Sequence, residues 1–275
     1  MKPIIYKPTR FFFIIYLVTY ISWFIAAYIS YQPDGEALYT PFMLPGLVAP
    51  FLTALWMIRS SHSKEMWKQF TGRLFNLHLI NLTGFLPSLL IIPAAILIST
   101  FISIALGGDP HQLQFSEGFS FSIGLLPSLL VLVLAASFEE LGWRSYAMDS
   151  LHSTRSYFPA SLIFALLWAG WHLPLFFING TYQNLIALEN IWYAVNFVVS
   201  TIPMAIIISW ICRLNRGSIA AAILFHFFIN LSQEALQITQ GTKCIETAII
   251  SLIAVIVVLS NKTMFFDKPI DEVTE

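Results

Sequence analysis

FSIGLLPSLLVLVLAASFEELGWRSYA, residues 121–147, is the stretch that decides the class of fold. As a helix it is long enough to cross the roughly 30 Å hydrocarbon core of a bilayer. Its apolar run ends in two adjacent acids, Glu139 and Glu140, and Arg144 follows one turn later. Charged groups within a membrane-length apolar segment are costly, and they usually mark a function. The stretch therefore predicts a membrane helix that carries a functional site.

Seven further apolar segments of similar length indicate a polytopic all-α bundle. The chain has 275 residues, of which 57% are hydrophobic and 11% are charged, whereas soluble domains carry about 25% charged residues. We predict one integral membrane domain, residues 1–275, with eight transmembrane helices and with its polar motifs in residues 135–235. The predicted spans are 11–31, 39–58, 79–106, 121–147, 158–178, 190–212, 217–238 and 244–261.

The charges in the loops predict that both chain ends are cytoplasmic. With N-in and C-in topology, all Lys and Arg residues except Lys243 fall on the cytoplasmic side, as the positive-inside rule requires. This topology predicts a multi-pass protein of the cell (cytoplasmic) membrane that contacts membrane lipids. The net charge of −1 argues against nucleic acid as a partner. The cytoplasmic cations are Lys2, Lys7, Arg10, Arg59, Lys64, Lys68, Arg73, Arg144, Arg155, Arg213, Arg216, Lys262 and Lys268.

Residues 60–78 are predicted to form an amphipathic helix that lies on the cytoplasmic face instead of spanning. Trp67, Phe70, Leu74 and Leu77 recur at helical spacing, with three cations among them. We expect this helix to serve as an anchor between the second and third spans.

Ionisable residues inside the predicted spans fall in three places, and the first is the end of 121–147. Glu139 and Glu140 are adjacent, so they point about 100° apart on a helix. Glu140 and Arg144 are four residues apart and can form an ion pair along one face. This pairing would leave Glu139 free to face the interior of the bundle.

The other two places supply histidines. His172 lies in the fifth span, and Trp168 precedes it by one turn and can form the wall of a pocket. His226 and Asn230, in the seventh span, share a helix face. His172 alone is compatible with a ring that bonds a backbone carbonyl, and His226 with Asn230 is compatible with a helix–helix hydrogen bond. However, polar groups on three helices at similar depth indicate one shared site.

The chemistry that this set fits best is hydrolysis. A carboxylate with a histidine can activate water as a general base, and a second histidine with an amide can donate to an oxyanion. No Ser or Cys is placed as a nucleophile. Two His and one Glu also form a known zinc set, so a divalent metal such as zinc is an alternative. However, the His-Glu-x-x-His motif is absent, and we expect no cofactor.

The three motifs together resemble the CAAX prenyl protease 2 and bacteriocin-processing family, the type II CAAX endopeptidases. The resemblance rests on Glu139-Glu140-x-x-x-Arg144, on Trp168-x-x-x-His172 and on His226-x-x-x-Asn230, and it covers about residues 135–235. Before residue 120 the similarity lies only in hydrophobicity. The second motif of the family often begins with Phe, where this chain has Trp168.

The resemblance implies an intramembrane endopeptidase and a role for each site residue. Glu139 would be the catalytic carboxylate, with His172 as its partner in activating water. His226 and Asn230 would form the oxyanion site, and Glu140 and Arg144 would hold the arrangement in place.

The substrate implied is a peptide or protein, in one branch of the family a prenylated CAAX tail that loses its C-terminal tripeptide. Two other functions stay open at this point. One is a non-catalytic bacteriocin-immunity or binding member of the same fold, and the other is a proton-coupled transporter.

Overall fold

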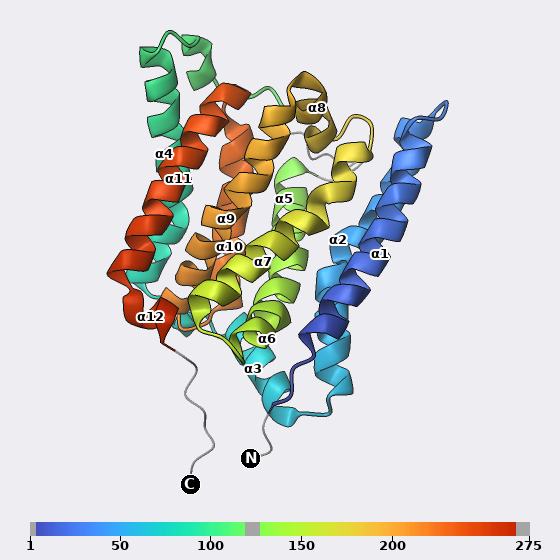
Figure 1. Ribbon diagram of the computed structural model, residues 1–275, viewed down its shortest axis with the longest axis vertical. Helices are drawn as coiled ribbons and strands as arrows, with labels where there is room; N and C mark the ends of the chain where they lie inside the picture. Colours follow the sequence, from blue (N-terminus) through green and yellow to red (C-terminus); the bar gives the residue numbers. More distant parts are fainter. Residues whose placement is uncertain (1–3, 119–126, 268–275) are drawn as a thin grey trace.

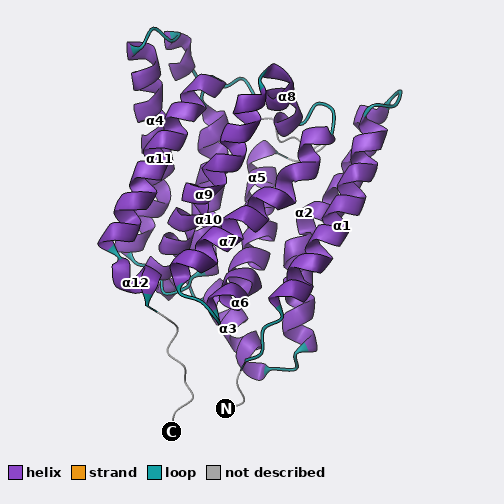
Figure 2. Ribbon diagram, in the orientation of Figure 1, coloured by secondary structure: helices purple, strands orange, loops and turns teal. Residues whose placement is uncertain are grey.

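The computed structural model describes residues 4–118 and 127–267, and it is helical throughout (Figure 1). Within these ranges no β-strand occurs, and one isolated bridge joins Phe115 to Leu236 (Figure 2). The long helices are α1 (Pro8–Ser30), α2 (Gly35–Ser60), α4 (Leu82–Ala105), α5 (Ser128–Gly142), α7 (Tyr157–His172), α9 (Ile191–Leu214), α10 (Ile219–Ala235) and α11 (Gln240–Ser260). The shorter helices are α3 (Lys64–Phe75), α6 (Met148–His152), α8 (Tyr182–Glu189) and α12 (Lys262–Phe266).

In the described part of the chain, six helical segments are long and apolar enough to cross a membrane. They correspond to six of the eight predicted spans. The predicted spans 217–238 and 121–147 contain the shorter helices α10 and α5, and residues 119–126 lie outside the described ranges. An all-helical, multi-pass membrane protein is thus confirmed, whereas the count of eight spans stays a prediction.

The surface of the bundle is what a lipid environment requires. Large apolar side chains such as Phe13, Leu166 and Leu252 are more than 60% exposed, although they lie within long helices. Soluble monomers rarely expose apolar patches of this extent. The apolar surface therefore faces lipid, and the polar groups of the site lie between the helices.

α5 lies between neighbouring helices, which brings the acidic motif into the interior. α5 packs between α2 and α10, while α9 packs against α7, α10 and α11. α1 and α2 form a pair at one edge of the bundle, and α4 and α11 form the opposite edge (Figure 1). The start of α1 lies at the same end of the bundle as α3, α6 and α12.

A close contact fixes α5 against α2 just after the two acids. A Cβ atom built on Gly142 would lie 2.4 Å from the backbone carbon of Pro50. Only glycine permits this approach, because a side chain would overlap the α2 backbone.

The amphipathic helix predicted in residues 60–78 is present as α3. Ser63 caps it by accepting a hydrogen bond from the Met66 backbone N–H, and Met66 and Phe70 are buried against the bundle. The prediction was wrong for Leu77, because α3 ends at Phe75 and Leu77 lies in a separate 3₁₀ turn with an exposed side chain. The tail from residue 268, with Lys268, and the N-terminal Lys2 lie outside the described residues.

Candidate active site

The two acids lie at the C-terminal end of α5, in the interior of the bundle. Glu139 is 6% exposed and Glu140 is fully buried. Directly after them the helix widens into a π-helical turn, Trp143–Ala147, which continues into α6. Such turns occur frequently at functional sites, because they redirect side chains within a helix. Here the turn carries Trp143 and Arg144, and both side chains contact the acids.

Glu140 forms the centre of a buried charged network. Its Oε2 atom accepts a hydrogen bond from Arg144 Nε at 2.8 Å, which confirms the predicted pairing. Its Oε1 atom lies 2.9 Å from His226 Nδ1. Arg144 also donates from Nη1 to the Ser209 hydroxyl on α9 at 2.9 Å, and its guanidinium lies over the Phe164 ring. The network joins α5, α9 and α10, so it fixes the direction of the His226 ring.

Glu139 is oriented by two tryptophans instead of by a cation. Trp168 Nε1 donates to Glu139 Oε2 at 2.8 Å, and Trp143 Nε1 donates to the same oxygen at 3.2 Å. The other oxygen, Oε1, lies 3.9 Å from His226 Nε2. This separation exceeds a direct hydrogen bond. One carboxylate oxygen is therefore held, while the other faces the imidazole across a gap.

His172 lies at the end of α7, next to these groups. Its Nδ1 atom is 2.8 Å from the Trp168 backbone carbonyl. A carbonyl oxygen can only accept, so Nδ1 carries the proton and the lone pair of the neutral ring is on Nε2. The ring packs edge-on against Trp171 and Phe197 and lies 5.7 Å from the Trp168 ring.

The structure thus brings together five of the six polar residues that the motifs predict. Asn230 lies one turn after His226 on α10, and it is half-buried. Within the described ranges, its amide makes no hydrogen bond with the other candidate residues. Trp168 was predicted only as a pocket wall, yet it also donates a hydrogen bond to Glu139.

Sequence reasoning missed two residues around the site, Trp143 and Ser209. Trp143 follows Glu139 by four residues, so helical spacing could have identified it as a neighbour. Ser209 lies in a different span and gave no such signal. The expectation of ionisable residues in only three spans was also wrong, because Glu246 on α11 is 2% exposed and accepts hydrogen bonds from Gln233 at 2.8 and 2.7 Å.

The alternative of a metal centre can be compared with the donor atoms of the site. Among the described residues, no three His, Cys, Asp or Glu side chains lie close enough to hold a metal ion together. The Nδ1 atoms of His172 and His226 form hydrogen bonds within the protein, and so do both carboxylate oxygens of Glu140.

Comparisons with known proteins agree with this geometry. A family model described as "Type II CAAX prenyl endopeptidase Rce1-like" matches residues 121–232, which include every candidate site residue. The chain is 50% identical over 263 residues to the CAAX prenyl protease 2 of Methanococcus maripaludis, and the match covers 96% of this chain and 97% of the relative. The protein therefore belongs to the type II CAAX prenyl endopeptidase family, and it is a membrane-embedded endopeptidase.

Proposed function

We propose that the protein hydrolyses peptide bonds with a water molecule that Glu139 activates, and that it removes the C-terminal tripeptide from prenylated CAAX-type tails. One observation carries this proposal: Glu139 has one oxygen held by two indole N–H groups and the other facing His226 Nε2 across 3.9 Å. A water molecule that approaches this gap can be held by both groups at once.

Glu139 acts as the general base in this proposal. The two indole donors fix the carboxylate plane, so Oε1 presents its lone pairs toward the gap. The activated water attacks the scissile carbonyl carbon, and its proton passes to Oε1. Both indole donors are uncharged, so they orient the Glu139 carboxylate without stabilising its negative charge as strongly as a bound cation would. The carboxylate therefore keeps its tendency to accept a proton.

His172 serves as the second acceptor in water activation. Its Nδ1–H is committed to the Trp168 carbonyl, so the Nε2 lone pair is available to accept the proton that Glu139 takes from the water. The ring can then give this same proton to the leaving amine when the C–N bond breaks, as general acid–base catalysis requires.

His226 stabilises the negative oxygen of the tetrahedral intermediate, together with Asn230. Glu140 accepts from His226 Nδ1, so a protonated ring has its Nε2–H left to donate toward the gap. Asn230 lies one turn further along the same face of α10 and can supply a second donor. Glu140 and Arg144 contribute by holding the His226 ring in this direction.

The substrate class comes from the relatives and from the chemistry of the surroundings. The related protein is a CAAX prenyl protease, and a prenylated tail is a lipid-bearing peptide that partitions into the membrane. We place the site in the cytoplasmic half of eight spans in the cell membrane, with both chain ends in the cytoplasm. Such a tail can then reach the site from the inner leaflet.

Cleavage of a farnesylated CAAX peptide by purified full-length protein tests the proposal. Glu139→Gln keeps the shape of the side chain and removes the base, so we expect kcat to fall by about 10²–10⁴-fold. Glu246→Gln is the matched control, because it neutralises another buried carboxylate that lies outside the site, and it should keep wild-type activity. Full activity of Glu139→Gln would show that a different group activates the water.

We further propose that the reaction needs no resident metal, because Glu139 and His172 can activate water directly. Elemental analysis of active protein, combined with a chelator control, checks this point. One equivalent of zinc that is removed together with activity, and that restores activity when added back, would contradict it.

A further inference from the structure

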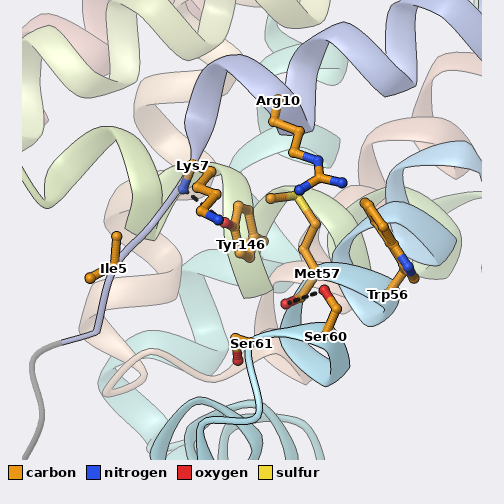
Figure 3. A pocket seen from close by; sticks show the side chains of 8 residues that line it. All are labelled: Ile5, Lys7, Arg10, Trp56, Met57, Ser60, Ser61 and Tyr146. Carbon is orange, nitrogen blue, oxygen red and sulfur yellow. Dashed lines mark hydrogen bonds between the residues drawn. The ribbon is translucent and has the colours of Figure 1, made fainter.

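A polar pocket, separate from the candidate active site, lies at the end of the bundle where α1 begins (Figure 3). It has no role in the proposed proteolytic reaction. Its volume is about 160 Å³. A water molecule occupies about 30 Å³ in the liquid, so the pocket has room for a tetrahedral anion such as a phosphate group. The lining residues are Ile5, Lys7, Arg10, Trp56, Met57, Ser60, Ser61 and Tyr146.

The charge of this pocket is entirely positive. Lys7 and Arg10 line it, and no acidic residue does. Within residues 4–118 and 127–267, neither cation forms an ion pair with a carboxylate. Arg10 lies over the Trp56 ring, 4.7 Å from its centroid. The stacked ring holds the guanidinium in place and leaves its N–H groups available for an anion.

The backbone around the pocket is fixed before any ligand binds. The Lys7 backbone N–H donates to the Tyr146 hydroxyl at 2.9 Å, which ties the start of α1 to the π-helical turn 143–147. Met57 is buried, and the Ser60 hydroxyl donates to the Met57 backbone carbonyl at 3.3 Å (Figure 3). A fixed cleft with two cations differs from loose surface charges, because little ordering is needed on binding.

The location of the pocket determines which anions it meets. α1 and α2 are membrane-length helices, and the pocket lies where one begins and the other ends. This is the level of the lipid headgroups, where a half-exposed tryptophan such as Trp56 is typical. Arg and Lys bind phosphate through charge-assisted hydrogen bonds.

We propose that this pocket binds the phosphate group of an anionic membrane lipid. The lipid phosphate lies between Lys7 and Arg10, and its apolar chains follow the exposed apolar surface of α1 and α2. The same chemistry would accept free inorganic phosphate, so the test must separate the two sources.

The test measures ligand binding to the purified full-length protein in a neutral detergent. The ligands are dihexanoyl phosphatidylglycerol, its zwitterionic phosphatidylcholine analogue and inorganic phosphate, each followed by native mass spectrometry and by the thermal midpoint. We expect saturable binding of the anionic lipid and much weaker binding of the zwitterionic one. The double variant Lys7→Gln/Arg10→Gln should lose roughly fivefold in affinity for each cation removed.

The matched control is Lys64→Gln/Lys68→Gln, which removes two exposed cations of α3 outside the pocket. It should bind the anionic lipid as the wild type does. Ser60→Trp keeps both pocket cations and fills the cavity, so it should also weaken binding. Equal losses in the two double variants, or unchanged binding in Ser60→Trp, would show that general surface charge attracts the lipid and would overturn the proposal.

Inorganic phosphate gives the remaining outcome. If it competes with the lipid at equal concentration, the pocket is an anion site that needs no membrane-anchored ligand, and the lipid assignment is overturned. If it competes only weakly, the lipid chains contribute to binding, as the position of the pocket predicts.

Discussion

Arg144 provides the sharpest test of the buried network, because its removal leaves a carboxylate without its cation. Arg144 is 1% exposed and Glu140 is fully buried, and 2.8 Å separates Arg144 Nε from Glu140 Oε2. Breaking such a pair costs about 3–5 kcal/mol, since the remaining charge stays buried and unpaired. Arg144→Met keeps most of the side-chain volume, so we attribute the loss to charge.

The double variant Glu140→Gln/Arg144→Met separates the charge effect from packing. Replacing both partners with uncharged residues of similar size is often neutral for stability. We therefore expect the double variant to recover most of the stability that Arg144→Met loses. For Arg144→Met, the loss of about 3–5 kcal/mol lowers the unfolding midpoint by about 10 °C. Thermal unfolding in detergent can resolve this shift.

Activity should follow a different pattern from stability in these variants. His226 Nδ1 lies 2.9 Å from Glu140 Oε1, so a neutral Gln at position 140 removes the negative charge that supports a protonated ring. The double variant should then be stable yet slow, with kcat reduced about tenfold or more, the size of one charge-assisted hydrogen bond. Two outcomes would refute this account of the network. One is that Glu140→Gln and Arg144→Met each lose less than about 1 kcal/mol of stability and that the two losses add in the double variant. The other is full activity of the double variant.

Two further predictions concern the hydrogen bond from Trp168 to Glu139 and the close contact between α5 and α2. Trp168→Phe removes the 2.8 Å donor to Glu139 and should lower kcat about tenfold with little change in KM; steady-state kinetics on the farnesylated peptide measures it, and an effect on KM alone would contradict the positioning role. Gly142→Ala places a methyl group 2.4 Å from the Pro50 backbone carbon and should reduce the free energy of unfolding by about 1–3 kcal/mol; an unchanged unfolding midpoint would show that the α2–α5 contact can relax.

The amino-acid sequence by itself determined the fold class and the set of candidate site residues. Apolar segment length is a local property, so helices appear where the hydropathy pattern predicts them. The spacing of Glu140 and Arg144 was enough to predict their ion pair, because residues four apart are neighbours on any helix. The three motifs were enough to identify the family, and the comparison with the CAAX prenyl protease confirmed it.

Only the tertiary structure decided how these residues face one another. The direction of Glu139 depends on an indole from α7, and the direction of His226 depends on a carboxylate from α5. The Ser209 contact with Arg144 and the Glu246 contact with Gln233 also join different helices. Sequence spacing fixes which side chains share a helix face, but the packing of one helix on another sets the rotation that brings two faces together. The motifs therefore predicted the candidate groups, and packing determined which Glu139 oxygen is held and which one faces His226.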